Sequence, residues 1–441
     1  MSPQRAPSSE LEASDERFWK EQENRLTRQI GQPCCSLNAL AGMLVTMPGN
    51  FAVVLHGEAD CASCFVHAPG PSADKFYATR ITQSRFTLGK TAEPLAKCLR
   101  LIIRHRSPEA VFVLGNCLME MIHDDFERVA RDIQQETGTP VIALRASGLK
   151  AASQAEMVDW LYSTFATLAK KPSDGASRRG LVNFIALPEI NRQELRLELE
   201  GVLSAAGLRM RGRYPFETSL SDWQGILEAE ADFVVDKSLF PRLVRSLDSL
   251  GAATVEVPLP VGLGSSRRFF EVIGGHSGAL KEIRKACAPL EDKASKRLSR
   301  FRAKYGGLRV AVGMRMENNC RADQLAYDGL GDLSLFVEAG FKVDLFIQGP
   351  PEEKARKHFK QRLVQLGCDM PFHVFPDPFN LPPLLKAGRF DVAYLADHAR
   401  GEALKAGVPL IRSRSLEPFY EGMLHNLEYL DQVLEEIRRN K

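Results

Sequence analysis

Three cysteines in the first third of the chain, Cys35, Cys61 and Cys117, are the residues best suited to chemistry. Each stands where an apolar stretch gives way to a turn or a helix start, so a fold can hold the three thiolates toward one point. Thiolate is the ligand that iron–sulfur clusters take, and a cluster needs three or four of them. The spacing is not the compact C-x-x-C pattern of a ferredoxin or a zinc ribbon. Three ligands from one chain leave at least one iron for another group, which predicts a partner subunit.

A packing role is the alternative for every cysteine, because a buried thiol behaves as a small hydrophobic side chain. Cys34 competes with Cys35 as the first ligand, since a shift of one residue would exchange them. Cys64 stands about one turn beyond Cys61 and is an alternative fourth ligand. The remaining cysteines have no ligand-like partners in the sequence and are predicted to be structural: Cys98, Cys287, Cys320 and Cys368.

Alternating strands and helices must position these thiols. Apolar runs over 51–55, 110–114 and 140–144 predict short buried strands. Amphipathic helices are predicted over 92–105 and over 124–136. This alternation indicates a parallel sheet covered by helices, and ligands of such sheets bind at the carboxyl ends of the strands. Cys61 and Cys117 both follow predicted strands and are therefore expected at that edge.

The same alternation restarts twice, so the chain is predicted to be α/β, with three Rossmann-like domains whose parallel sheets are flanked by helices. The predicted divisions are a polar N-terminal arm over 1–28, a cluster-binding domain over 29–170, a second domain over 178–305 and a third over 306–441. The second ends in a long helical stretch in which Pro289 predicts a kink or a break. Later strands are predicted over 181–187, 231–235, 254–257, 308–314, 342–347, 391–395 and 409–411.

Composition excludes several classes of protein. The 441 residues are 44% hydrophobic and 26% charged, with a formal net charge of +3, and no concentrated basic stripe suggests nucleic-acid binding. The apolar runs are interrupted well short of a membrane span, and the first residues do not resemble a secretory signal. Nine cysteines without export signals favour a reducing cytoplasm over a disulfide framework. No nucleic-acid or membrane partner is expected.

The N-terminal third resembles the component 1 family of nitrogenases and nitrogenase-like reductases. Cys35 lies 21 residues before His56, and the family carries a cysteine at about that distance before a His-Gly-Pro/Ser-x-x-Cys motif. Here the motif reads His56-Gly57-Glu58-Ala59-Asp60-Cys61. The third ligand motif is similar as well, because the pair Asp124-Asp125 follows Cys117 by seven and eight residues.

The resemblance implies an iron–sulfur cluster, either 4Fe–4S or larger like the nitrogenase P-cluster, shared with a partner subunit. Cys35, Cys61 and Cys117 would be its ligands, and His56 and Gly57 would lie beside it. His56 either donates a hydrogen bond to cluster sulfide or is satisfied within its own turn. The expected partners are a homologous α-like subunit, in a heterotetramer, and an ATP-hydrolysing iron protein that donates electrons. The chain itself has no phosphate-binding G-x-x-x-x-G-K-[ST] loop.

Two departures from the family narrow the expected function. The cysteine that anchors the large nitrogenase cofactor aligns near Asp236, and the anchoring histidine is absent from residues 411–417. The chain is therefore expected to be a β-like or scaffold-type subunit. The first hypothesis is an oxidoreductase subunit that relays ATP-driven, low-potential electrons from an iron protein to a substrate or cofactor site shared with the partner. The alternative is a non-catalytic scaffold on which an iron–sulfur cofactor matures. No catalytic residue is assigned.

Overall fold

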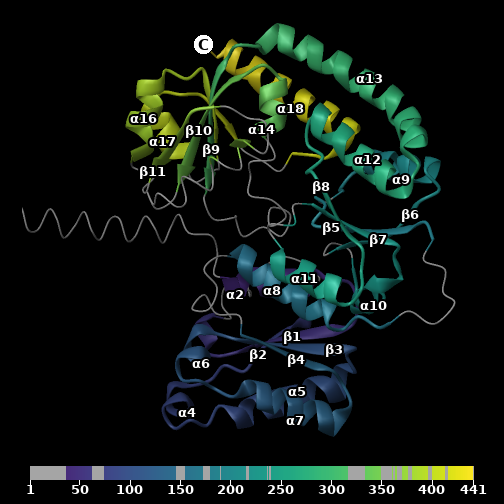
Figure 1. Cartoon of the computed structure of the whole chain (residues 1–441). Coiled ribbons are helices and arrows are strands. Elements are labelled where there is room, and N and C mark those ends of the chain that lie inside the picture. The colour runs from purple at the N-terminus through teal and green to yellow at the C-terminus, as the bar shows by residue number, and fades with distance from the viewer. Residues whose placement is uncertain are drawn as a thin grey trace, which may run out of the picture.

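The computed structural model describes residues 36–61, 74–145, 154–171, 179–188, 190–214, 218–235, 237, 240–315, 333–348, 360, 363–364, 370–375, 380–395, 400–412 and 416–440. Three parallel sheets flanked by helices make up this part of the chain, which confirms the predicted fold class. Figure 1 shows the first sheet at the bottom, the second in the middle and the third at the upper left.

The first sheet has the strand order β2-β1-β3-β4. Its side chains alternate between two cores: Phe51, Val53 and Leu55 of β1 face one, whereas Ala52 and Val54 face the other. Burial on both faces explains why β1 and β3 read as uninterrupted apolar runs. The strands are β1 (Phe51–His56), β2 (Phe76–Ala78), β3 (Ala110–Gly115) and β4 (Val141–Arg145). The helices are α2 (Ser36–Thr46), α4 (Gln83–Thr87), α5 (Ala92–Arg106), α6 (Cys117–Met121), α7 (Phe126–Thr137) and α8 (Gln154–Ala166).

The second sheet has the order β6-β5-β7-β8. Helices α8 and α11 pack together between the first sheet and the second (Figure 1). The strands are β5 (Leu181–Ile185), β6 (Arg209–Tyr214), β7 (Ala231–Val235) and β8 (Thr254–Val257). The helices are α9 (Gln193–Ala205), α10 (Leu220–Gln224), the short 3₁₀ helix η2 (Ile226–Glu228), α11 (Pro241–Ser249) and α12 (Leu263–Ser277).

The third sheet has the order β11-β10-β9-β12-β13. The strands are β9 (Arg309–Arg315), β10 (Lys342–Gln348), β11 (Phe372–Phe375), β12 (Val392–Leu395) and β13 (Leu410–Arg412). The helices are α14 (Leu333–Glu338), α16 (Leu381–Gly388), α17 (Arg400–Ala406) and α18 (Phe419–Arg439). Within the described ranges, no helix combines the length and the apolar character needed to cross a membrane.

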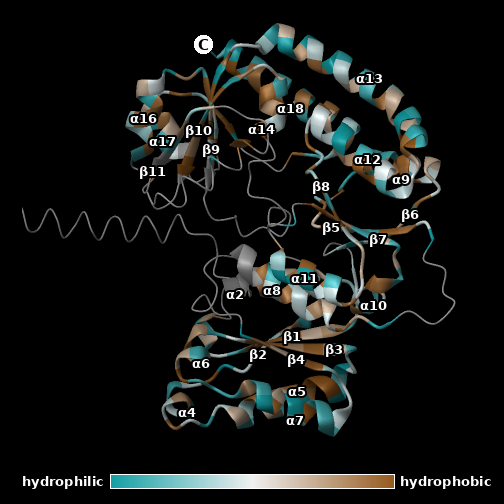
Figure 2. Cartoon of the chain, in the orientation of Figure 1, coloured by the Kyte–Doolittle hydropathy of each residue, from teal (hydrophilic) through white to brown (hydrophobic). Residues whose placement is uncertain are grey.

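Helix α13 (Leu280–Tyr305) arches over the outside of the molecule and packs against α18 (Figure 1). Figure 2 shows polar residues along α13 and hydrophobic ones along the strands of the first sheet. The helix continues through Pro289, so the break expected there is absent. Neighbouring packing holds α13 as one helix, with Ile283, Cys287, Ala294 and Leu298 buried along it.

The strands predicted from apolar runs are all present, within a few residues of the expected bounds. Three further strands, β2, β6 and β11, were not predicted. Each is the outermost strand of its sheet, where one side has no neighbouring strand. Strand β6 was missed because it is only partly buried and carries three arginines, which interrupt the apolar run that marks a buried strand. Its sequence is Arg209-Met-Arg-Gly-Arg-Tyr214.

Carboxylates from another sheet's helices hold three helix N-termini. Helices α11, α12 and α18 make no side-chain cap of their own. Asp159 of α8 accepts two amide hydrogens at the start of α11, Glu338 of α14 accepts two at α12, and Glu198 of α9 accepts two at α18. Each contact satisfies backbone donors that a helix end leaves free. Because each joins helices of different sheets, the three carboxylates fasten the sheets to one another.

Candidate functional site

The carboxyl ends of β1 and β3 form the edge at which the sequence places two thiols. The two strands are neighbours, and His56 at the end of β1 pairs with Gly115 at the end of β3. The Asn116 amide then donates to the His56 carbonyl at 3.2 Å, which keeps the departing chains together. Cys61 and Cys117 follow within a few residues, and both are half-buried. The structure therefore brings these two predicted ligands to one edge.

Asn116 links the two segments that carry the thiols. Its buried side chain is the N-cap of α6, because Oδ1 accepts the Met119 amide at 3.0 Å. Its Nδ2 lies 3.5 Å from the Cys61 sulfur and donates to it. Cys117 is the next residue and begins α6. One asparagine thus positions the helix that bears Cys117 and contacts the sulfur of Cys61.

His56 is enclosed by protein groups. Its ring is fully buried, with Nδ1 3.1 Å from the Thr79 hydroxyl and Nε2 3.5 Å from Asp124 Oδ1. The Thr79 oxygen also accepts the Gly57 amide at 3.2 Å. Nδ1 therefore has a partner in this chain, whereas the buried Nε2 has no hydrogen-bond partner among the described residues, and neither alternative for His56 is favoured. The roles of His56 and Gly57 beside a cluster stay predictions.

Asp124 is the polar centre behind this edge. It accepts a hydrogen bond from the Thr91 hydroxyl and faces His56. Burial by itself raises the pKa of Asp124. Contacts with His56 and Thr91, together with the charges of His56 and Arg145, outweigh burial and hold the pKa below its ordinary value. Asp124 was predicted to open a helix, but α7 starts at Phe126 with Asp125 as its N-cap. Asp125 alone takes the local helix-end role.

Arg145 ends β4 at the same sheet edge. Its guanidinium pairs with Glu127, donates to the Asp124 carbonyl at 3.0 Å and lies over the Phe126 ring, 5.0 Å from its centroid. The bond to Glu127 raises the pKa of Arg145, and the nearby charges of Glu120 and Asp124 add to it. A fixed positive charge therefore stands one strand away from the thiols.

The other cysteines divide into two groups. Cys98 lies in α5 and packs against the core from that helix. Burial raises the pKa of its thiol to about 11. Cys287 is buried in α13, where burial raises its pKa to about 12. Both fit the predicted structural role. Several predicted positions lie outside the described residues: Cys34, Cys35, Cys64, Asp236, Cys320 and Cys368.

The side chains at this sheet edge are of the kind that binds iron–sulfur clusters. Cys61 and Cys117 supply soft sulfur ligands, and one of them already receives an N–H donor, a contact typical of cluster thiolates. Among the residues that the structure describes, no three metal-ligating side chains converge on one point.

The residues that sequence reasoning missed here are Thr79, Thr91 and Asn116. Thr79 lies on the connection after the unpredicted edge strand β2, so nothing in the sequence placed it against His56. Asn116 had a signal: an asparagine directly after a strand and before a helical residue is a preferred N-cap. Its contact with Cys61 spans 55 residues and depends on the neighbouring order of β1 and β3.

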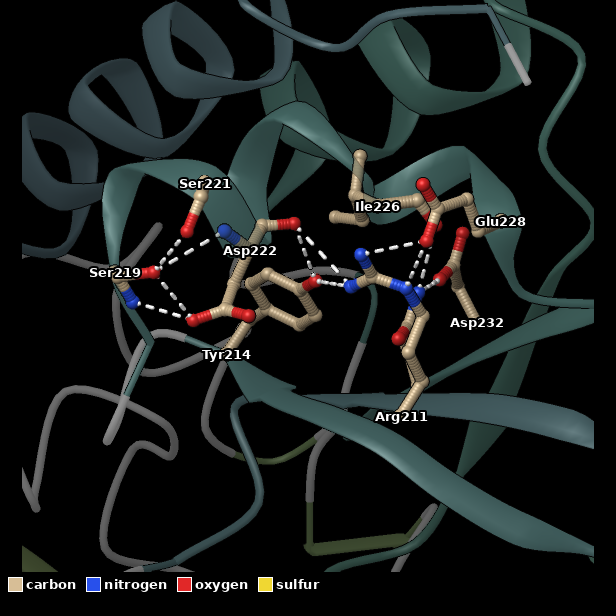
Figure 3. Close-up of polar contacts among 9 residues, drawn as sticks. Arg211, Tyr214, Ser219, Ser221, Asp222, Ile226, Glu228 and Asp232 are labelled. Carbon is tan, nitrogen blue, oxygen red and sulfur yellow. Dashed lines mark hydrogen bonds and ion pairs between the residues drawn. The ribbon is translucent and has the colours of Figure 1, made fainter. Parts of the chain in front are cut away.

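A second polar cluster lies in the middle sheet and is shown in Figure 3. Arg211 of β6 pairs with Glu228 and donates to the Tyr214 hydroxyl at 2.7 Å, while Ser219 and Asp222 form a capping box at the start of α10. Burial raises the pKa of Asp232, behind Arg211, to about 6. These contacts tie β6, α10 and β7 together. The Tyr214 and Ser219 hydroxyls are both engaged in these contacts, a structural role.

A cavity of about 260 Å³ lies between α12, α13 and α18. Its charged lining residues are paired with each other, Arg267 with Glu291 and Arg284 with Glu271. Cys287 and Tyr420 also line it. Because the positive charges are already neutralised, the cavity gives no support for an anion site at Arg267.

Comparison with known proteins agrees with the resemblance. A family model described as nitrogenase component 1 type oxidoreductase matches residues 33–326. The chain is 23% identical over 388 residues to the nitrogenase iron-molybdenum cofactor biosynthesis protein NifE of Sinorhizobium fredii, covering 81% of this chain and 71% of that protein. It is 25% identical over 291 residues to subunit N of the light-independent protochlorophyllide reductase of Prochlorococcus marinus, covering 63% and 65%.

Solved structures agree at the level of the fold. A structure titled nitrogenase Cp1 at pH 5 superposes with a TM-score of 0.72 at 13% identity, covering 90% of this chain and 87% of that one. The same protein at pH 6.5 gives a TM-score of 0.70 at 12% identity. Likeness at such low identity shows a shared fold alone.

Proposed function

Because this chain belongs to the nitrogenase component 1 type oxidoreductase family, we propose that it is the iron–sulfur subunit of a nitrogenase-like reductase. In this proposal Cys61 and Cys117, with Cys35, hold one side of a cluster that a homologous partner subunit completes. The bound cluster would accept and pass on single low-potential electrons that an ATP-hydrolysing iron protein supplies. The substrate or cofactor site would be shared with the partner.

The observation that carries the proposal is the meeting of Cys61 and Cys117 at one sheet edge. They come from strands more than fifty residues apart, yet β1 and β3 are neighbours in register. The Asn116 side chain bridges the two thiol-bearing segments. Around them, His56, Asp124 and Arg145 form a fixed polar layer that this chain provides without outside help. Such a layer holds the ligand-bearing turns in place while the sulfurs stay half-exposed toward a partner.

The test is anaerobic co-purification of the full chain with a candidate partner, followed by iron and sulfide analysis and electron paramagnetic resonance after reduction. Cys61→Ala and Cys117→Ala should each lose most of the bound iron. Cys98→Ala is the matched control and should keep the bound iron, because Cys98 packs from α5 against the core. A colourless wild-type complex, or full iron in the Cys61→Ala and Cys117→Ala proteins, would refute the cluster assignment.

A second candidate function is a scaffold on which an iron–sulfur cofactor matures. It is supported by the match over 81% of this chain to a protein of nitrogenase cofactor biosynthesis, and by the missing cofactor-anchoring residues. A scaffold must release what it holds, whereas a reductase subunit keeps its cluster through many turnovers. Chase of iron-57-loaded complex with an apo-acceptor separates the two. Transfer of label to the acceptor supports the scaffold, and retention with reversible reduction supports the reductase.

A further inference from the structure

We propose that Asn116 is a positioning residue that sets the electron affinity of the thiolate at Cys61 through an N–H donor. The inference rests on the proposed function where it concerns a cluster, but the hydrogen bond belongs to this chain alone. Asn116 is almost fully buried, with 2% of its surface exposed, and its amide has a partner at each end.

The orientation of the Asn116 amide is dictated by its backbone partner. The Met119 amide is a donor only, so the atom that faces it at 3.0 Å must be Oδ1. Nδ2 is then directed to the other side, where the Cys61 sulfur lies at 3.5 Å. The backbone of α6 therefore guarantees that an N–H, rather than an oxygen, is presented to the thiol.

Other residue types would cap the helix equally well. Asp, Ser and Thr are all preferred N-caps and would accept the Met119 amide. Serine and threonine also carry an O–H donor, but their hydroxyl is one bond shorter than the asparagine amide nitrogen, whereas aspartate has no donor and would put a negative charge beside a thiolate. Asparagine therefore caps α6 and presents an N–H to the Cys61 sulfur at the same time.

Gly57 leaves the space that this arrangement needs. A Cβ added at Gly57 would lie 2.3 Å from Asn116 Nδ2 and 2.4 Å from Cγ, closer than any real contact. The amide of Asn116 thus packs directly on the main chain of the turn that leads to Cys61. That turn cannot move away from the amide without also losing the Gly57 bond to Thr79.

A donor to sulfur stabilises the more electron-rich state. With a cluster bound, it favours the reduced state and raises the midpoint potential. Loss of the donor should therefore make the cluster harder to reduce.

The decisive variants are Asn116→Asp and Asn116→Ser. Both keep an acceptor for the Met119 amide and remove the amide N–H; the first also adds a charge, whereas the second leaves only a shorter hydroxyl. Asn50→Asp is the matched charge control, since Asn50 precedes β1 at the opposite end of the same sheet and bonds the carbonyls of Arg106 and Ser107. Thermal unfolding of each variant checks that α6 remains capped.

Two readouts separate this inference from the proposed function. In metal-free protein, Asn116→Ser and Cys61→Ala should have non-additive effects on the free energy of unfolding in a double-mutant cycle, whereas those of Asn50→Asp and Cys61→Ala should add. In the iron-loaded complex, Asn116→Asp should shift the reduction equilibrium at least about tenfold toward the oxidised state, which is about 59 mV for one electron. Asn116→Ser should shift it the same way by less.

The outcomes are distinct. Additive effects of Asn116→Ser and Cys61→Ala would overturn the inference even if the complex binds iron. Non-additive effects in a complex that binds no iron would leave the hydrogen bond established and refute the cluster assignment instead. A midpoint potential that moves equally in Asn50→Asp and Asn116→Asp would also overturn the inference, because general charge would then explain the shift.

Discussion

Space at Gly57 is the tightest constraint on a single residue at the site. An alanine there would drive its methyl group into the Asn116 amide. We expect Gly57→Ala to lower the free energy of unfolding by about 1–3 kcal/mol, the usual cost of overpacking. Chemical denaturation followed by circular dichroism measures it.

Gly42 provides the control for that substitution. It lies within α2, and a Cβ added there meets no atom within 4 Å. Gly42→Ala should raise stability by about 0.5–1 kcal/mol, because alanine favours a helix more than glycine does. If Gly57→Ala were as stable as Gly42→Ala, the packing of Asn116 on Gly57 would be wrong.

Desolvation should slow the reaction of two of the four described cysteines, Cys98 and Cys287. The thiolate is the nucleophile, and burial raises the pKa of Cys98 to about 11 and of Cys287 to about 12. Native, metal-free protein treated with iodoacetamide at pH 8 should be labelled at Cys61 and Cys117 about tenfold or more faster than at Cys98 and Cys287. Peptide mass spectrometry measures the order. Early labelling of Cys98 would show that its side of α5 is not packed against the core.

At the scale of elements, Asp124 joins β1, the start of α5 and the entry to α7. It contacts His56 and Thr91, and its own carbonyl accepts from Arg145. We expect Asp124→Asn to cost about 1–3 kcal/mol at neutral pH, since charge-assisted bonds to buried groups are lost. Thermal unfolding with Asp125→Asn alongside tests this, because Asp125 caps α7 but touches neither group.

The pH dependence of the same substitution has a definite sign. The folded pKa of Asp124 lies below its ordinary value of 3.8. Its stabilising contribution is therefore present above pH 3.8 and is lost as the pH falls through the lower folded value. Wild type and Asp124→Asn should converge in stability as the solution is made more acidic. A constant gap down to pH 3 would contradict the role of the carboxylate.

At the scale of the whole molecule, the three carboxylates that cap helices across sheets share one property. Burial raises the pKa of Asp159, Glu198 and Glu338. Helices of all three sheets are therefore fastened by groups that resist ionisation in the folded state. Loss of any one contact should loosen one sheet from its neighbour before either sheet unfolds.

Glu198 gives the clearest test, because burial raises its pKa from 4.5 to about 7. The folded state then binds an extra proton between those values, so stability falls as the pH rises from about 4.5 to about 7 and is flat above. The loss is about 3 kcal/mol at most. Glu198→Gln should lack this slope.

The measurement is the midpoint of thermal unfolding of wild type and Glu198→Gln at several pH values between 4 and 8. Glu200→Gln is the matched control, since Glu200 lies on the exposed side of the same helix. Its pH profile should match that of wild type. Identical slopes in wild type and Glu198→Gln would remove Glu198 as the source.

Much of the architecture follows from local pattern. The interior strands β1, β3, β5, β7, β9, β10 and β12 are apolar because both faces of their sheets are covered, and that signal needs no knowledge of their neighbours. Among the edge strands, β4, β8 and β13 were predicted from apolar runs, whereas β2, β6 and β11 were not. The latter three are recognised as strands only through their pairing with a neighbour, once the sheet order is known.

The residues of the candidate site likewise fall into those that the sequence singled out and those that only the structure showed. Residue type and position after a strand were enough to single out Cys61 and Cys117, and the carboxyl-edge rule for parallel sheets was enough to bring them together. Asn116, Thr79 and Thr91 act through contacts that cross from one chain segment to another. Hydrogen bonds of this kind depend on distances of a few tenths of an ångström. Local sequence carries propensity and periodicity, but only the packed sheets set such distances.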